Sequence, residues 1–301
     1  ELFRQGESIM KKWLKGLSVV GLAASLLLGA ARSSTVAAQG EFDGEKVTVG
    51  IVSGPAEDVW QVVVDKAAAD GIEVELILFN DYVQPNIALA DGSIDLNAFQ
   101  HVAFLENWNE ANEEDLSPVG FTFVSPMGAY SEKLTSFDEL EDGATIAIPN
   151  DPTNGGRAIL GLEIAGLIEV DDEAGYLPTL DDITDNPKNL EFQELDAAQL
   201  PIILPDVAAA FINLNFATDA GLSLTEDTIF VDADHPEELS EAYRNVIVAK
   251  GDNVDNPLYL QIAAYYQTVE VAQALYDTTN NGDKPAWENA PVIGEDGVVE
   301  E

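Results

Sequence analysis

Residues 47–79, VTVGIVSGPAEDVWQVVVDKAAADGIEVELILF, decide the fold class. The stretch opens with a short run rich in β-branched residues, and a Gly-Pro pair follows, so it predicts a buried strand. Apolar residues at helical spacing over 57–69, with Gly71 as a C-cap, predict a helix. Residues 74–79 predict the next strand. A strand, a helix and a strand in this order indicate parallel strands covered by a helix, which is the α/β class.

The next stretch, residues 81–101 (DYVQPNIALADGSIDLNAFQH), is a candidate ligand site. It follows the second strand, at the sheet edge where open α/β folds place ligands. Its flat rings are Tyr82, Phe99 and His101, and its neutral amides are Asn86, Asn97 and Gln100. Rings with a few polar groups suit a pocket for a small, partly apolar molecule. The alternative is structural: a helix capped by Asn86 and a buried strand ending at Phe99. Residue types alone leave both interpretations open.

Composition excludes several classes of function. The chain has 301 residues, 46% of them hydrophobic, which allows one large domain or two ordinary ones with a full core. Its formal net charge of -42 makes nucleic acid and anionic lipid poor partners. With no cysteine, it has no disulfide, no thiolate nucleophile and no Cys-ligated metal. The histidines, His101 and His235, lie far apart and show no zinc-binding spacing, so neither a metal nor a cofactor is predicted.

Residues 1–40 predict a signal peptide preceded by an N-terminal extension. A positive segment leads into the apolar run 17–31, and small residues at 35–39 suit a cleavage site. An uncleaved anchor is the alternative. Residues 27–30 (LLGA) resemble a lipobox with alanine in place of the lipidated cysteine, which would remove lipid attachment. Beyond residue 40 the chain keeps only eight basic residues: Lys46, Lys66, Lys133, Arg157, Lys188, Arg244, Lys250 and Lys284.

A second informative stretch is residues 149–157, PNDPTNGGR. It predicts a Gly-rich loop that opens a helix over 158–165. Backbone N–H groups at such a helix start favour an anion, and Arg157 adds a fork that can hold a carboxylate through two hydrogen bonds. The alternative is a surface arginine that balances nearby acids. Phosphate is a weaker possibility, because the GxxxxGK[ST] motif is missing.

The remaining elements follow from the same periodicities. A short helix begins near Pro85, and Pro and Gly within 125–131 indicate a crossover between lobes. Residues 280–301 predict a loose acidic tail. Further strands are predicted at 94–99, 119–124, 145–148, 190–195, 207–212, 229–231 and 243–248, and helices at 102–112, 215–220, 257–267 and 269–276. Asn213 follows one of these strands, Asn245 begins near another, and His235 is expected on the surface.

These motifs, taken together, resemble a known family. The long ordered stretches are DYVQPNIALADGSIDLNAFQH (81–101), FVSPMGAYS (123–131), GATIAIPNDPTNGGRAILGLEIAGLI (143–168), DDITDNPKNLEF (181–192), ELDAAQLP (194–201) and INLNFATDAGL (212–222). They are similar to the methionine-binding lipoprotein (MetQ/NlpA) family of ABC-importer substrate-binding proteins. The resemblance covers about residues 46–277.

The resemblance implies a two-lobed α/β periplasmic-binding-protein fold with a ligand cleft. Lobe 1 would comprise 45–124 plus 233–279, lobe 2 would comprise 125–232, and 280–301 would form the acidic C-terminal tail. The positions matching the family's ligand-binding residues then have expected roles. Arg157 would hold the ligand's α-carboxylate with Asn154 nearby, Asn213 and Asn245 would bind the amino-acid head group, and Tyr82, Phe99, His101 and Tyr130 would wall the thioether. Asn86 and Asn97 are expected to hold loop and helix ends instead.

The implied function is binding, not catalysis. We expect a monomeric protein, secreted across the cytoplasmic membrane to the periplasm or cell surface, that delivers L-methionine or a close analogue to an ABC permease. A different small amino acid or a dipeptide is the alternative ligand, and a hydrolase using His101 as base is a minor alternative function. The chain departs from the family at the missing lipobox cysteine, in its strong acidity, and in HPEELSEAYRN (235–245), which is longer than the family's usual approach to Asn245.

Overall fold

The computed structural model of the chain describes residues 40–234, 241–294, 297 and 299–300. The predicted signal peptide, apart from Gly40, and His235 therefore lie outside the described residues. Among the residues described, no helix combines the length and apolar character that crossing a membrane requires.

The first sheet, within the described chain, has six strands: β1 (Lys46–Val52), β2 (Glu73–Phe79), β3 (Leu96–His101), β4 (Ser117–Val124), β12 (Arg244–Ala249) and β13 (Lys284–Pro285). Their order is β13-β4-β12-β3-β1-β2. Strand β1 runs parallel to β2 and β3, whereas β12 runs antiparallel to β3 and β4. The predicted parallel strand–helix–strand start is therefore confirmed.

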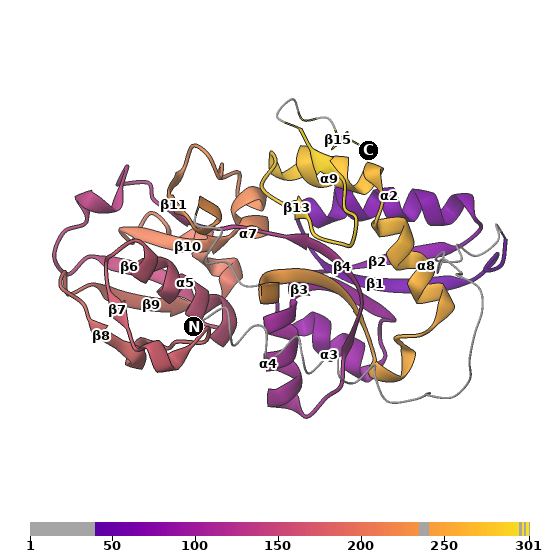
Figure 1. Cartoon of the computed structure of the whole chain (residues 1–301), viewed down its shortest axis with the longest axis horizontal. Coiled ribbons are helices and arrows are strands. Elements are labelled where there is room, and N and C mark those ends of the chain that lie inside the picture. Colours follow the sequence, from indigo (N-terminus) through magenta and orange to yellow (C-terminus); the bar gives the residue numbers. More distant parts are fainter. Residues whose placement is uncertain (1–39, 235–240, 295–296, 298, 301) are drawn as a thin grey trace, which may run out of the picture.

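Helices cover both faces of the first sheet (Figure 1). They are α2 (Pro55–Ala69), α3 (Gln84–Asp91), α4 (Val102–Asn112), α8 (Pro257–Tyr266) and α9 (Val269–Thr279). Alternate residues of β12 point to opposite faces, so Ile247 packs with the core under α2, α8 and α9. Its neighbours Val246 and Val248 pack with Leu89 of α3 and Leu105 of α4. Burial on both faces explains why these strands read as continuous apolar runs.

The second sheet, among the described residues, has five strands: β5 (Met127–Tyr130), β6 (Thr145–Pro149), β9 (Glu191–Leu195), β10 (Ala209–Asn213) and β11 (Thr228–Val231). Their order is β11-β5-β10-β6-β9, with β6 parallel to β9 and β10, and β5 antiparallel to β10 and β11. Its helices are α5 (Pro152–Ile164), α6 (Leu200–Ile203) and α7 (Leu214–Asp219). Two further pairs of short strands form separate sheets: β7 (Glu169–Val170) with β8 (Ile183–Asp185), and β14 (Val292–Ile293) with β15 (Val299–Glu300).

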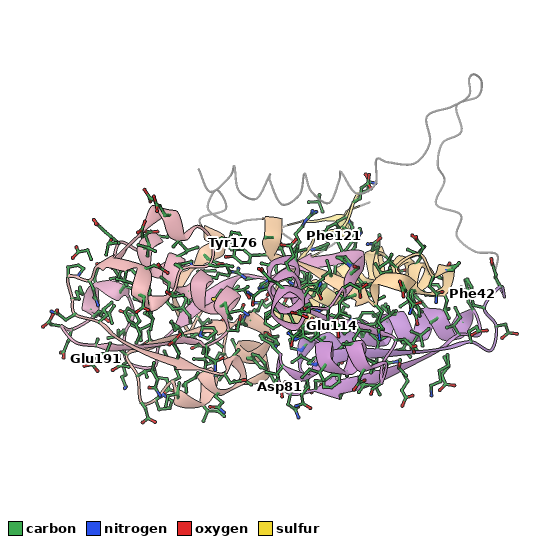
Figure 2. The ribbon with its side chains drawn as sticks, turned by 90° about the horizontal axis from the view of Figure 1, so that it is seen from below. Phe42, Asp81, Glu114, Phe121, Tyr176 and Glu191 are labelled. Carbon is green, nitrogen blue, oxygen red and sulfur yellow. The ribbon has the colours of Figure 1, made fainter. Side chains whose placement is uncertain are left out.

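The two sheets lie side by side along the long axis of the molecule (Figure 1). The view turned by 90° shows the same arrangement, with Phe42 toward the outer end of the first part and Glu191 toward that of the second (Figure 2). The chain passes from the first sheet to the second through residues 125–126, and it returns after β11. The expected two-part α/β fold is confirmed.

The start of α5 differs from the prediction. The sequence predicts a loop up to Arg157, but α5 begins at Pro152. Asp151 is its N-cap, and Oδ1 of Asp151 accepts the backbone N–H of Asn154 at 2.9 Å. A proline in the first turn costs no helical hydrogen bond. Asn154 and Arg157 therefore project from the first turns of a helix, which fixes their direction more firmly than a loop would.

The crossover prediction for 125–131 is only partly right. Met127–Tyr130 forms an interior strand, between β10 and β11, and all four of its residues are buried. Its alternate side chains enter different cores, so that Met127 packs with one and Tyr130 with the other. The connection between the sheets is thus confined to Ser125-Pro126.

The predicted loose tail from residue 280 is also wrong for its first part. Lys284 and Pro285 pair with β4 as strand β13. Trp287 is only 7% exposed and its ring lies 6.1 Å from that of Tyr266, centroid to centroid. One buried tryptophan and one strand pair are enough to hold this segment on the first sheet. The acidic composition of the segment gave no sign of either contact.

A buried amide cluster ties α3 to β3. The side-chain amide of Asn86 donates to Gln100 Oε1 at 2.8 Å and accepts from Gln100 Nε2 at 2.6 Å. Asn97 Nδ2 also donates to Asn86 Oδ1, at 2.8 Å. The N-cap of α3 is Val83, so the interpretation of Asn86 as a cap is wrong. The expectation that Asn86 and Asn97 hold local structure in place is confirmed.

Replacing Asn86 by alanine removes the centre of this cluster. We expect Asn86→Ala to lower the free energy of unfolding by about 2–4 kcal/mol, because two buried amides lose partners. Chemical denaturation measures this change. As a control, Asn112→Ala removes an exposed amide and should change the free energy of unfolding by no more than about 0.5 kcal/mol. Equal stability of the two variants would contradict the structural role of the cluster.

Candidate ligand-binding site

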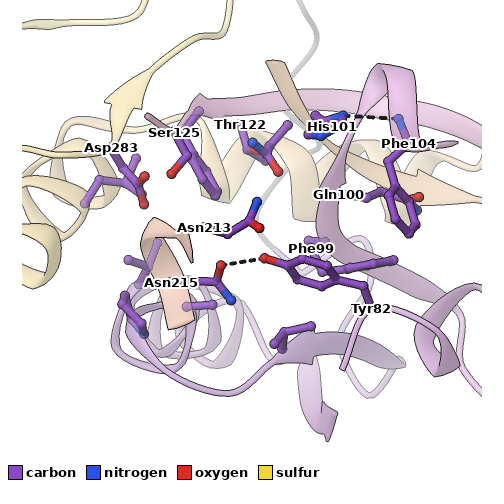
Figure 3. Close-up of a pocket in the computed structure, with 18 of the residues that line it drawn as sticks. Tyr82, Phe99, Gln100, His101, Phe104, Thr122, Ser125, Asn213, Asn215 and Asp283 are labelled. Carbon is purple, nitrogen blue, oxygen red and sulfur yellow. Dashed lines mark hydrogen bonds between the residues drawn. The ribbon is translucent and has the colours of Figure 1, made fainter. Parts of the chain in front are cut away.

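A pocket lies between the two sheets (Figure 3). The first sheet and its connections contribute the loop after β2, strand β3 and strand β12, and the second contributes α5 and the end of β10. Seven of the eight predicted site residues line it: Tyr82, Phe99, His101, Asn154, Arg157, Asn213 and Asn245. The eighth, Tyr130, is fully buried in the core of the second sheet and does not line the pocket, which corrects its expected place in the wall.

Aromatic rings form one wall of the pocket. The ring centroid of Tyr82 lies 5.9 Å from that of Phe99 and 4.9 Å from that of Phe216. Phe104, on α4, packs edge-on against Phe99 with centroids 5.8 Å apart. Rings at these distances form a rigid apolar surface that needs little ordering when a ligand binds.

The hydroxyl of Tyr82 joins the two parts of the molecule. It donates to Oδ1 of Asn215 at 2.5 Å (Figure 3). Burial raises the pKa of Tyr82 well above its ordinary value of 10.0, so the phenol keeps its proton and remains a donor. Since Asn215 belongs to α7 of the second part, this hydrogen bond crosses the pocket.

His101 is a neutral wall residue. It is only 6% exposed, and its Nδ1 accepts the backbone N–H of Phe104 at 3.1 Å, as the N-cap of α4. The neutral ring therefore carries its proton on Nε2, which lies 3.4 Å from Asn154 Oδ1. Burial, and secondly the nearby charge of Arg157, lower the pKa of His101 to about 3. The ring stays uncharged at neutral pH.

Asn154 is hydrogen-bonded to several neighbours and has few hydrogen-bonding positions left for a ligand. Its Nδ2 donates to both carboxylate oxygens of Asp151, at 3.1 and 3.0 Å. Its Oδ1 accepts from Asn213 Nδ2 at 2.9 Å and faces the Nε2–H of His101. The role that these contacts support is to position His101 and Asn213 across the pocket.

Arg157 is buried and touches both connections between the sheets. Its Nε and Nη2 lie 2.7 and 2.6 Å from Asp232 Oδ2, just after β11. Its Nη2 also donates to the carbonyl oxygen of Ser125, between β4 and β5, at 2.9 Å. The guanidinium lies over the ring of Tyr243, 4.5 Å from its centroid. Within the described residues these bonds use Nε and Nη2, which leaves Nη1 for a ligand.

The sequence did not single out several pocket residues. Asn215 had a weak signal, because it is the second amide at the end of a predicted strand. Phe104, Thr122, Ser125 and Asp283 also line the pocket (Figure 3). They lie in segments predicted as helix, strand, crossover or tail, and neither type nor spacing marks them. The ligand-binding positions that the resemblance to the family implied did not include them.

The side chains of the pocket suit the binding of a small ligand. The pocket offers rings, amides, hydroxyls, one guanidinium and the carboxyl group of Asp283, and no group of three His, Cys, Asp or Glu within the described chain could hold a metal ion. His101, the base of the hydrolase alternative, has a pKa near 3 and both ring nitrogens engaged. Such a ring is a poor general base at neutral pH.

Two α/β sheets joined by short connections, with a pocket of rings and polar groups between them, define a substrate-binding protein. Comparison with known proteins gives the family. The chain belongs to the NlpA lipoprotein family, whose model matches residues 47–287.

Similar proteins include curated relatives and solved structures. The chain is 42% identical over 281 residues to a probable D-methionine-binding lipoprotein MetQ of Vibrio cholerae, covering 92% of this chain and 100% of that one. It is 43% identical over 253 residues to D-methionine-binding lipoprotein MetQ of Escherichia coli K12, covering 83% and 91%. A Burkholderia cenocepacia nutrient-binding protein bound to methionine has a TM-score of 0.76 at 39% identity, over 80% of this chain and 100% of that chain. A crystal structure of the methionine-binding protein MetQ has a TM-score of 0.75 at 42% identity, over 81% and 99%.

The neutral state of His101 has a measurable consequence. We expect its ring signals in NMR spectra to stay unchanged between about pH 8 and pH 5. Because the folded pKa lies below the ordinary value of 6.5, the unfolded chain binds the proton first, and stability falls as the pH drops from 6.5 toward 3. A His235→Gln variant assigns the signals. A titration midpoint near 6.5 would show that the ring is solvated.

Proposed function

We propose that this chain is the solute-binding protein of an ABC importer and that it binds methionine in the pocket between its sheets. The observation that carries the proposal is the joining of Arg157 and a wall of aromatic rings in one pocket. Charge at one end and rings at the other match an amino acid with an apolar side chain. The similarity to proteins named for methionine supports the same ligand.

The head group of the ligand would lie against Arg157. Nη1 would donate to the α-carboxylate, while Asp232 and Ser125 hold the rest of the guanidinium in place. A preorganised guanidinium binds a carboxylate without paying to order its own side chain. Asn213 and Asn245, at the end of β10 and in β12, would bind the same head group.

The side chain of the ligand would lie against Tyr82, Phe99, Phe104 and His101. A thioether packs favourably at the edges of rings, and a neutral imidazole adds no charge that would have to be desolvated. The resemblance of the motifs to the family implied L-methionine, whereas several curated relatives are named for D-methionine. Both enantiomers therefore belong in the test.

The two sheets would act as lobes that close on the ligand. We propose lobe 1 as residues 45–124 with 233–279, extended by β13, and lobe 2 as 125–232. The connections at Ser125-Pro126 and after Val231 would act as the hinge. The closed monomer would dock on the permease outside the cytoplasmic membrane. The sequence contains no cysteine.

Calorimetry tests the ligand and the role of Arg157 together. We expect wild-type protein to bind methionine and Arg157→Lys to bind it about 10- to 100-fold more weakly, because lysine lacks the fork but still neutralises Asp232. Arg157→Ala should lose more, several kcal/mol in binding, but it also leaves Asp232 buried without a partner.

The matched control for this experiment is Arg244→Lys. Arg244 is half-buried and, like Arg157, lies over a ring, that of Phe121, but it does not line the pocket. The Arg244→Lys variant should bind methionine with an affinity within about threefold of that of wild type. Absence of binding by wild-type protein at millimolar methionine would overturn the ligand proposal, and equal binding by both lysine variants would overturn the role of Arg157.

A further inference from the structure

Asp283 is a buried acid that faces the pocket without a partner for one of its oxygens. It precedes β13, is only 7% exposed and lines the pocket. Its backbone N–H donates to Thr279 Oγ1 at 3.0 Å, which fixes the main chain. Its carboxylate oxygen Oδ1 has no hydrogen-bond partner in the described protein. A buried polar atom without a partner costs folding free energy, so its presence calls for a reason.

Nearby charge does not supply that reason. The next residue, Lys284, directs its Nζ to the carbonyl and side-chain oxygens of Asn281, and no ion pair joins it to Asp283 among the described residues. Burial raises the pKa of Asp283 to about 7, and the Ser125 hydroxyl and Lys284 only partly offset this effect. The carboxylate of Asp283 therefore has fewer hydrogen-bond donors around it than a buried carboxylate needs.

The position of Asp283 relates it to the head-group end of the pocket. Figure 3 shows Asp283 beside Ser125, with Tyr82, Gln100 and Phe104 toward the opposite side. The carbonyl oxygen of this same Ser125 accepts from Arg157. Ser125 thus connects the acid to the guanidinium that is proposed to hold the ligand's carboxylate.

A second acceptor in the pocket is also unpartnered. Asn213 donates its Nδ2 to Asn154, and its own Oδ1 is buried without a hydrogen-bond partner in the described protein. The pocket therefore holds two buried acceptors, Asp283 Oδ1 and Asn213 Oδ1, that need donors. A primary ammonium brings three N–H donors and a positive charge.

We propose that Asp283 is a ligand-binding residue that accepts the ammonium group of the ligand, with Asn213 Oδ1 as a further acceptor. This inference rests on the proposed function and deepens it. The pocket then requires a ligand with both a carboxylate and a free primary amine: an α-amino acid, or a short peptide with a free N-terminus. The carboxylate–ammonium contact is charge-assisted and shielded from water, so the amine contributes strongly to affinity.

The test compares ligands with and without the amine. Calorimetry would measure methionine, glycyl-methionine, N-acetylmethionine and deaminated methionine, 4-(methylthio)butanoate, on wild type and Asp283→Asn. We expect wild type to prefer an amine-bearing ligand over deaminated methionine by about 100-fold, and Asp283→Asn to reduce that preference at least about tenfold. Affinity for the deaminated ligand should change no more than about threefold. Whether methionine or glycyl-methionine shows the effect identifies the source of the amine.

The control is Asp95→Asn, the same substitution at an acid bonded to Thr48 and Tyr259 away from the pocket. It should leave the preference for an amine unchanged. Without ligand, Asp283→Asn should melt at or above the wild-type temperature, because it relieves an unpartnered carboxylate, and Asp283→Ala serves as a second variant.

Three results would overturn the inference. The first is that wild-type protein binds deaminated methionine with an affinity within about threefold of that for the amine-bearing ligands. The second is that Asp283→Asn weakens the binding of all four ligands by the same factor, which is the effect expected of a residue with a purely structural role. Both results leave the proposed function standing. Failure of wild type to bind any of the four ligands would overturn the inference and the proposed function together.

Discussion

The buried pair of Arg157 and Asp232 is the interaction on which the arrangement of the pocket depends. Arg157 projects from the first turns of α5, and its partners lie in the two connections between the sheets: Ser125 on the way out and Asp232 on the way back. Asp232 also accepts the backbone N–H of Met127, at the start of β5. A buried ion pair repays its desolvation only when further hydrogen bonds satisfy it, and these do so. The same guanidinium that fixes the connections would hold the ligand, so binding and lobe closure act on the same atoms.

Neutral hydrogen bonds complete the link across the pocket. Asn154 joins His101 of the first sheet to Asn213 of the second, and Tyr82 reaches Asn215. None of these groups carries a charge at neutral pH, so the two sides can separate without exposing an uncompensated ion. The charged contacts are concentrated near Ser125, where Arg157 and Asp283 lie. This division gives the pocket a polar end for a zwitterionic head group and an aromatic wall for an apolar side chain.

Sequence patterns predict the elements well and the pocket unevenly. Short apolar runs identify the strands because both sheets are buried on both faces, and the helical spacing of apolar residues identifies the helices. The glycines at 155 and 156 suggested a loop, yet they lie within α5, where a Cβ on Gly155 would come within 2.6 Å of the Pro149 carbonyl oxygen. The resemblance to the family implied that Tyr130 is a wall residue, but its strand is interior and the side chain is buried in the core. The sequence did not mark Asp283, because one acid among many in an acidic segment is not distinctive. Only the fold, by pairing β13 with β4, places it at the pocket.

The pocket is proposed to take up methionine, an amino acid with an apolar side chain. The most direct measurement is mass spectrometry of the native protein, followed by identification of the small molecule released on denaturation. We expect one methionine per chain, either retained through purification or taken up when it is supplied. A retained molecule without a carboxylate and a free amine, or a wild-type protein that neither keeps nor takes up methionine, would contradict the proposal.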